Sequence, residues 1–497
     1  MAIPALERYD PFVGGEFRPP REGARFESID PARGHAWAEV GEASPADVDE
    51  CVRTAAAAFA GEEWRSLSAS ARGLLLLRLA DAIDESAERL AELETRDNGK
   101  LHRDLMAQLR TVPDWLRYFG GLADKVEGRT IPLDRISIFN YTIPEPLGVV
   151  AVISPWNSPI FLALMSAAPA LAAGNTVVVK PSEVTSVSIL EVARLASEVG
   201  FPPGTFNVIT GAGATGRALV DHPDVAKIAF TGGTEAGRAV ALAAAGRLAR
   251  TTLELGGKSA NIVFEDADLE RAEGGILAGI FANAGQTCVA GSRALVHERA
   301  FDRLVERLAA RADQIKLGDP MDADTEVGPV ATLAQLEKVD SFVERARSEG
   351  AEVIAGGKRA ALPELPDGYF YRPTVINGAK RDSDLAQNEV FGPVLAVLPF
   401  RSEDEAIAIA NDTRYGLAAG VWTQDVNRAH RMARALETGT VWVNMYRAIA
   451  PQTPFGGFKQ SGIGVQNGQQ AMQEYLQTKS VWVELSEEVQ DPFAKRS

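Results

Sequence analysis

The sequence predicts an α/β protein with two α/β units and a small β arm. Between residues 149 and 237, four short apolar runs each end in a turn rich in glycine or polar residues, in repeated strand–turn–helix units. The same alternation resumes after Gly257. Apolar strands that alternate with helices are typical of a parallel sheet with right-handed crossovers.

Length and composition set the class of protein. The chain has 497 residues, enough for two or three domains, and its 46% hydrophobic and 24% charged residues are ordinary for a soluble globular protein. The formal net charge of −16 argues against nucleic acid or an anionic membrane as a partner. No apolar run of about 18 residues and no basic leader with an apolar core are present, so we expect neither membrane insertion nor export.

Cysteine and histidine usage points to a reducing compartment without a resident metal. Cys51 and Cys288 are the two cysteines, which cannot make a disulfide framework, and a cytoplasmic location is the simplest setting. The five histidines have no metal-ligand spacing, so we expect no metal.

The first part of the chain predicts turns, then helices, then a hairpin. Residues 1–45 contain Gly14-Gly15 and Asp30-Pro31 and should be extended. Apolar spacing of three and four then predicts helices that cover a sheet, at 47–59, 68–85 and 86–95, with another helix from after Asn98-Gly99 to about 123. Alternation and β-branched residues predict a hairpin over residues 125–148.

The strand–turn–helix units place polar residues at one edge of the first sheet. The expected strands are 149–153, 175–179, 206–210 and 225–230. Ligands bind beyond the carboxyl ends of such strands. Asn157, Lys180, Glu183, the glycine cluster 211–216 and the turn Gly232–Gly237 all fall there.

The second unit should repeat the pattern at greater length. We expect strand 260–264, helix 269–284, strand 294–296, helix 301–314, an element at 389–394, helix 403–411, and strands 419–423 and 440–444. The glycine-rich stretch 454–462 is expected to be a loop.

Two residues in the segment 251–293 can carry chemistry. Glu254 lies among apolar neighbours before Gly256-Gly257, and Cys288 lies in a run of small residues. A thiolate can add to a carbonyl carbon, and a carboxylate can activate water against the resulting thioester. Read separately, a lone cysteine is more often a buried apolar residue and such a glutamate a turn residue. They are too far apart to meet on one element, so only the fold can bring them together.

Both motifs resemble those of the aldehyde dehydrogenase superfamily, in its hydrolytic, non-acylating branch. The matching stretches are LELGGKS at 253–259 and GQ-x-C-x-AGSR at 285–293, and the resemblance runs from about Asp30-Pro31 to Val483. It implies a Rossmann-like NAD-binding domain (1–124 and 149–253), a catalytic domain (254–445) and an oligomerisation arm (125–148 and 470–497). In the arm, the hairpin would pair with strand 480–483 and support a homodimer or homotetramer.

The resemblance also implies catalytic roles. Cys288 would attack the aldehyde, and the Asn157 side chain with the Cys288 backbone amide would stabilise the oxyanion. Loss of hydride would leave a thioester, which Glu254 would help water to hydrolyse. Many members carry a second glutamate near the C-terminus, where this chain has Gln477, so Glu254 would act alone.

The cofactor residues follow from the same resemblance. Lys180 and Glu183 would contact the adenosine ribose, Glu389 the nicotinamide ribose, and Phe391 the nicotinamide. Further expected positions are Ile153, Trp156, Gly213, Phe230, Gly232, Gly233, Gly237 and Leu255. The Gly232–Gly237 spacing is weak by itself, and lysine or glutamate here could be plain surface charge. Because the Glu183 carboxylate would repel a 2′-phosphate, we expect NAD, with NADP possible.

A mostly apolar substrate tunnel is implied around Cys288 and the glycine-rich loop. Its expected residues are Ser158, Phe161, Leu162, Met165, Thr287, Val289, Arg447, Ile449 and Phe455. Arg447 could meet an anionic substrate tail or be an ordinary surface arginine. The sequence does not name the aldehyde, and a coenzyme A-acylating enzyme or a non-catalytic structural relative are the alternative functions.

Overall fold

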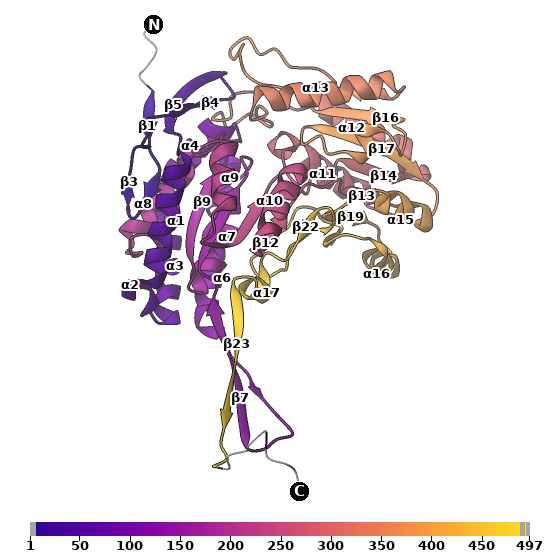
Figure 1. Ribbon diagram of the computed structural model, residues 1–497. Coiled ribbons are helices and arrows are strands. Elements are labelled where there is room, and N and C mark those ends of the chain that lie inside the picture. The colour runs from indigo at the N-terminus through magenta and orange to yellow at the C-terminus, as the bar shows by residue number, and fades with distance from the viewer. Residues whose placement is uncertain (1–5, 488–492, 494–497) are drawn as a thin grey trace.

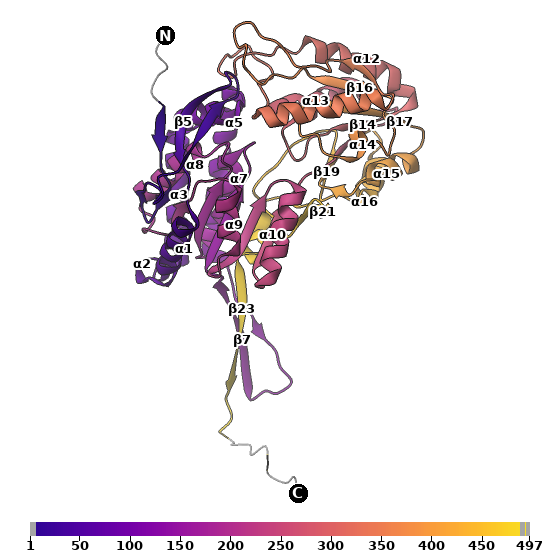
Figure 2. The same cartoon turned by 45° about the horizontal axis from the view of Figure 1, so that its top comes forward.

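The structure is a computed structural model that describes residues 6–487 and 493. Two large sheets with their helices form the body, and a narrow arm projects from it (Figures 1 and 2). The expected α/β class is confirmed. The outer ends of two predicted ranges, residues 1–5 and most of 488–497, lie outside the described residues.

The N-terminal residues form strands and turns, as the sequence predicts. One small sheet has the order β1-β5-β4, with β1 at Glu7–Tyr9, β4 at Arg25–Asp30 and β5 at His35–Gly41. The hairpin β2 (Phe12–Val13) and β3 (Glu16–Phe17) extends one edge of a larger sheet.

That larger sheet has eight strands in the order β22-β12-β11-β8-β9-β10-β2-β3. Its parallel core is β8 (Val149–Ser154), β9 (Thr176–Pro181), β10 (Phe206–Val208), β11 (Val225–Thr231) and β12 (Arg250–Glu254). All of these strands except β12 begin and end within two residues of a strand that the sequence predicts.

Helices cover both faces of this sheet because successive strand residues point to opposite sides. Val150 and Val152 pack in one core with α3 (Ala69–Glu85), α6 (Val112–Leu122), α7 (Pro159–Ala172) and α8 (Val187–Glu198). Ala151 and Ile228 pack in another with α1 (Pro45–Ala60), α9 (Gly213–Asp221) and α10 (Thr234–Gly246). The remaining helices at this end are α2 (Glu62–Arg65), α4 (Ala87–Asn98) and α5 (His102–Leu109).

The second sheet has seven strands in the order β15-β16-β17-β14-β13-β19-β20. They are β13 (Ala260–Val263), β14 (Arg293–His297), β15 (Glu352–Ala355), β16 (Thr374–Asn377), β17 (Val394–Phe400), β19 (Ala418–Trp422) and β20 (Thr440–Val443). The associated helices are α11 (Leu269–Phe281), α12 (Glu298–Gln314), α13 (Leu333–Ser348), α14 (Asp384–Gln387), α15 (Glu403–Asn411) and α16 (Val426–Ala435). A separate apolar core fills this unit.

The arm is a three-stranded antiparallel sheet in the order β23-β7-β6. β6 spans Thr130–Ile131, β7 spans Ile138–Pro146, and β23 spans Leu476–Glu484. Val483 pairs with Phe139 and Leu476 with Pro146, so the C-terminal strand joins the hairpin as expected and starts four residues earlier. A short helix, α17 (Gly468–Gln473), precedes β23.

Three predicted elements are corrected. The helix expected to reach about 123 is two helices, α5 and α6, which break at Arg110-Thr111. The helix expected over 269–284 ends at Phe281, because Asn283 and Ala284 adopt left-handed backbone angles (φ 53° and 51°). The loop expected at 454–462 contains β21 (Phe458–Lys459), which pairs with β18 (Tyr415–Gly416), and the start of β22 (Gly462–Ile463), an edge strand beside β12.

Candidate active site

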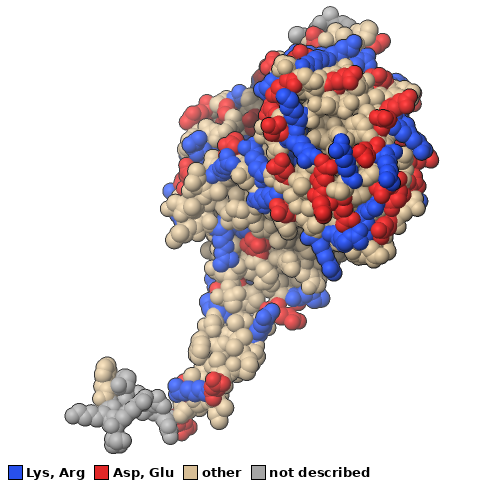
Figure 3. Space-filling model, turned by 90° about the vertical axis from the view of Figure 1, so that its right-hand side faces the viewer, with Lys and Arg blue, Asp and Glu red and all other residues tan. Residues whose placement is uncertain are grey.

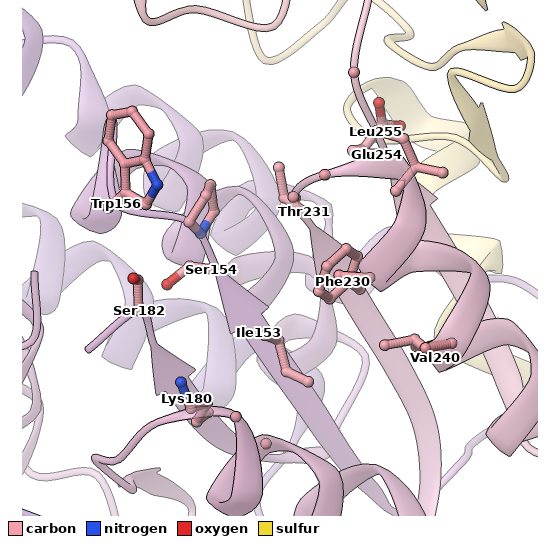
Figure 4. A pocket seen from close by; sticks show the side chains of 18 of the residues that line it. Ile153, Ser154, Trp156, Lys180, Ser182, Phe230, Thr231, Val240, Glu254 and Leu255 are labelled. Carbon is pink, nitrogen blue, oxygen red and sulfur yellow. The ribbon is translucent and has the colours of Figure 1, made fainter. Parts of the chain in front are cut away.

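A cavity of about 550 Å³ opens beyond the carboxyl ends of the parallel strands (Figure 4). Ile153 and Lys180 are the next-to-last residues of β8 and β9, and Phe230 and Thr231 are the last two of β11. Of the cofactor positions expected from the sequence, Gly237 does not line the cavity. The positions that do line it are Ile153, Trp156, Lys180, Glu183, Gly213, Phe230, Gly232, Gly233, Leu255, Glu389 and Phe391.

The three expected catalytic residues line the same cavity although they come from distant elements. Asn157 lies between β8 and α7, Glu254 is the last residue of β12, and Cys288 follows the turn after α11. The fold therefore brings Glu254 and Cys288 together, as their chemistry requires.

A strained turn presents Cys288. Asn283, Ala284 and Gly285 have φ of 53°, 51° and 73°, which costs non-glycine residues free energy unless their surroundings hold them. A Cβ on Gly285 would lie 2.1 Å from the Gly392 carbonyl oxygen, so glycine is required there. Such strain concentrates at functional sites.

The Asn157 amide is fixed beside the cysteine segment. Its Nδ2 donates to the carbonyl oxygen of Gln286 at 2.9 Å, two residues before Cys288. Asn283 Nδ2 donates to the same oxygen at 3.1 Å. A primary amide has two N–H donors, so Asn157 keeps one for a ligand.

Glu254 is a buried carboxyl with an elevated proton affinity. Its side chain is 3% exposed, and among the described residues neither carboxyl oxygen has a hydrogen-bond partner. Burial raises the pKa of Glu254 well above its ordinary value because the charged form is poorly solvated. A carboxylate in this place is a strong base.

Cys288 is half-buried, and its thiol is difficult to ionise. Burial, with repulsion from the carboxylates of Glu389 and Glu254, raises the pKa of Cys288 to about 12. Only a small fraction of the Cys288 side chain is therefore a thiolate near neutral pH. Cys51, in contrast, is fully buried in α1 and cannot reach a substrate.

The strand-end part of the cavity fits a dinucleotide. Lys180 is 5% exposed, donates to the Pro181 carbonyl oxygen at 3.0 Å and lies 3.6 Å from Glu183, whose carboxylate is half-exposed. The Ser154 hydroxyl is buried without a partner among the described residues, which leaves it for a ligand. A Cβ on Gly233 would face open space at the start of α10, where backbone N–H groups favour a diphosphate.

The far end of the cavity carries residues suited to the second ribose. Glu389 Oε1 accepts a hydrogen bond from the Gly257 amide at 3.0 Å. Phe391 has φ 57° and packs edge-on against Trp156, with ring centroids 5.2 Å apart. Phe391 is therefore a second residue with a strained backbone at the cavity that Cys288 lines.

Several lining residues were not predicted. They include the polar Ser182, Arg217, Gln335 and Lys338 and the apolar Val220, Ala236, Ala239, Val240 and Ala243. The α10 residues recur at three- and four-residue spacing, a signal that was visible in the sequence but does not distinguish a ligand-facing stripe from a core-facing one.

Comparison with known proteins identifies the family. The aldehyde dehydrogenase family model matches residues 17–481. A relative from Acinetobacter baylyi, (Z)-2-((N-methylformamido)methylene)-5-hydroxybutyrolactone dehydrogenase, is 46% identical over 496 residues, 99% of this chain and 100% of that protein. The chain belongs to the aldehyde dehydrogenase family. Its reaction class is therefore the oxidation of an aldehyde.

Solved aldehyde dehydrogenase structures share the fold over almost the whole chain. Betaine aldehyde dehydrogenase from Staphylococcus aureus, in complex with NAD⁺, is 40% identical with a TM-score of 0.96 and covers 98% of this chain and 97% of its own. A putative aldehyde dehydrogenase from Burkholderia cenocepacia is 44% identical, also with a TM-score of 0.96, and covers 98% and 99%.

Not every expected residue of this aldehyde dehydrogenase lies in the cavity. Gly237 is set back, and a Cβ there would lie 2.3 Å from the Leu255 side chain, so this glycine permits helix–strand packing. Of the expected tunnel residues, Leu162 alone lines the cavity within the described chain. Met165, Val289 and Phe455 are buried in the apolar core, whereas Thr287 is half-buried and Ile449 is 39% exposed.

Two kinds of feature are absent from residues 6–487 and 493. No helix there is long and apolar enough to cross a bilayer. The same residues contain no group of three or more histidine, cysteine, aspartate or glutamate side chains that could hold a metal ion.

Proposed function

We propose that this enzyme oxidises an aldehyde to its carboxylic acid through a covalent Cys288 thioester. The observation that carries the proposal is the meeting of Asn157, Glu254 and Cys288 at one cavity from three separate elements. Attack of the Cys288 thiolate on the aldehyde carbon forms a tetrahedral oxyanion. The free Asn157 N–H and the Cys288 backbone amide stabilise it, each contributing about 3 kcal/mol.

NAD is the cofactor of this proposal, held by the residues at the strand ends. Lys180 and Glu183 would bind the adenosine ribose, the amides at Gly232 and Gly233 the diphosphate, and Glu389 the second ribose. When bound, NAD⁺ supplies the acceptor for the hydride that leaves the substrate carbon. The half-exposed Glu183 carboxylate supports NAD over NADP, since it would repel a 2′-phosphate.

Glu254 completes the reaction by activating water. Its raised pKa makes it a strong base, so it takes a proton from water as the hydroxyl attacks the thioester carbon. The bond to Cys288 Sγ breaks, and the carboxylic acid leaves. Gln477 is exposed on β23 and has no proton-accepting carboxylate, so it cannot share this role.

The decisive experiment measures NADH and products with and without coenzyme A. Hydrolytic oxidation predicts NADH and free acid without coenzyme A, whereas an acylating enzyme would require it and release an acyl thioester. A structural relative would produce neither. The buried Glu254 supports hydrolysis, because a water-activating base has no purpose in acyl transfer to coenzyme A.

We also propose the division into an NAD-binding domain (1–124 and 149–253), a catalytic domain (254–445) and an oligomerisation arm (125–148 and 470–497). Exposed apolar side chains on the arm support self-association, among them Ile136 at 94% and Trp482 at 61%. Figure 3 shows much of the arm without charged side chains. A homodimer or homotetramer would cover this surface, and the two free cysteines suit the cytoplasm.

A further inference from the structure

Arg447 is not an ordinary surface arginine. It has φ 66° in the segment after β20, and its Nη1 donates to the Ala278 carbonyl oxygen of α11 at 2.9 Å. The adjacent Tyr446 hydroxyl donates to the Val289 carbonyl oxygen at 2.9 Å, one residue beyond Cys288. The Tyr446-Arg447 segment is thus attached both to α11, before the Cys288 turn, and to the residue after it.

A second cation lies near Arg447, close to the oxyanion donor. Lys100 follows the end of α4 at Gly99 (φ 75°) and is 8% exposed. Its Nζ donates to the Ser158 hydroxyl at 3.3 Å, next to Asn157, and also to Gln108 of α5. The cofactor cavity is not lined by Ser158, Lys100 or Arg447. Both cations therefore lie beside the catalytic residues but outside the cofactor site.

Electrostatic interactions agree with this arrangement. Burial and then repulsion from Arg447 contribute to lowering the pKa of Lys100 to about 8. Burial also lowers the pKa of Arg447, while Tyr446, Asp104 and the Cys288 sulfur act in the opposite direction. Arg447 is thus near enough to interact with both Cys288 and Lys100.

Arg447 lacks a close carboxylate partner. The buried Glu94 interacts with Lys100, and Asp104 lies 3.7 Å from Arg103. No carboxylate oxygen of the described residues lies within 4 Å of the Arg447 nitrogens. A guanidinium has five N–H donors and matches a carboxylate in a two-point contact. A half-buried guanidinium without a carboxylate partner is suited to an anionic ligand.

We propose that the substrate is an aldehyde with a carboxylate on a short aliphatic chain, and that Arg447 binds this carboxylate. The inference rests on the proposed function, because it places the aldehyde carbon at Cys288. Lys100 adds a favourable field without direct contact. Phe161, Leu162 and Tyr446 are partly buried against the same apolar core as Cys288, which suits the methylene chain between the two ends.

The test compares aldehydes matched in length, succinic semialdehyde with butanal and glutaric semialdehyde with pentanal. The wild-type kcat/KM should favour the anionic member of at least one pair, and this preference should fall as salt screens the charges. Arg447→Met keeps the unbranched stem and should reduce the anionic-to-neutral ratio at least about tenfold, because charge-assisted hydrogen bonds are the stronger class. Arg447→Lys should retain part of the preference. Glutarate should inhibit the wild type competitively and the methionine variant much less.

Arg434→Met is the matched control, since Arg434 is exposed on α16 and the substitution changes net charge equally. Equal ratios for the Arg447 and Arg434 variants would overturn the inference. So would a wild-type preference for both neutral aldehydes, a result that needs no variant to fold. If the wild type oxidises neutral aldehydes with NAD⁺, the proposed function stands whatever the ratio; if it oxidises no aldehyde and Cys288 is never acylated, the proposed function itself fails.

Discussion

Replacing Glu254 with glutamine separates formation of the thioester from its hydrolysis. The side chain is 3% exposed, and neither oxygen has a partner among the described residues, so an amide of the same shape fits without breaking a contact. We expect stability to change by no more than about 1 kcal/mol at acidic pH, where the wild-type carboxyl is protonated in both the folded and the unfolded chain. Because burial raises the pKa of Glu254 above its ordinary value of 4.5, the unfolded chain releases this proton first as the pH rises. The wild type should therefore lose stability from about pH 4.5 upward, and Glu254→Gln should have the higher Tm at neutral and alkaline pH.

The kinetic effect should be a large loss of steady-state turnover. Loss of general-base catalysis costs about 10²–10⁴-fold, equivalent to about 3–5 kcal/mol in the barrier. Other carboxylates near the site are engaged: Glu389 accepts the Gly257 amide, and Glu474 contacts Lys227 and Thr252. No described carboxylate therefore replaces Glu254 without rearrangement.

Rapid mixing with NAD⁺ and aldehyde should show one burst of NADH per site, then very slow turnover. Mass spectrometry of the stopped reaction should find the acyl group on Cys288. Cys288→Ala should give neither burst nor adduct, and Glu349→Gln, an exposed change after α13, should behave as wild type. Wild-type steady-state turnover in Glu254→Gln, or an acyl group on Cys51, would show that the roles are wrongly assigned. Absence of the burst would show that Glu254 also activates the thiol.

Three further predictions test the cofactor, the thiol and the assembly. Glu183→Ser should raise kcat/KM with NADP relative to NAD, because a repelling carboxylate is removed; an unchanged ratio would contradict the assigned contact. Alkylation of Cys288 by iodoacetamide should accelerate up to about tenfold per pH unit across the alkaline range, since its pKa is raised to about 12 and the thiolate fraction grows with pH; a rate that levels off below about pH 8 would refute the raised pKa. Trp482→Asp places a charge on the apolar arm, so light scattering should show a smaller assembly than for the wild type; a wild type that is already monomeric at micromolar concentration would exclude the arm's proposed role.

The sequence alone determined the features that depend on local pattern. Apolar runs that end in glycine and polar turns located the parallel strands, because hydrophobic periodicity and turn propensity depend on residues that are close in the sequence. The same order placed Asn157 and Lys180 at strand ends, where the cavity opens. The two short motifs around Glu254 and Cys288 indicated the family, and the family model bears this out.

Tertiary structure decided what depends on contacts between distant residues. Spacing predicted an unbroken helix to 284, but the Gly392 carbonyl oxygen lies where a Cβ of Gly285 would be, and the chain turns left-handed there. β22 forms the edge of the first sheet because it pairs with backbone groups of β12 that no other strand of the sheet uses. From the sequence, Arg447 could be a surface arginine or part of the substrate site. In the structure, its hydrogen bond to the Ala278 carbonyl oxygen, 169 residues away, holds it half-buried near Cys288. Long-range hydrogen bonds and burial of this kind leave no periodic signal in the chain, and only the folded structure reveals them.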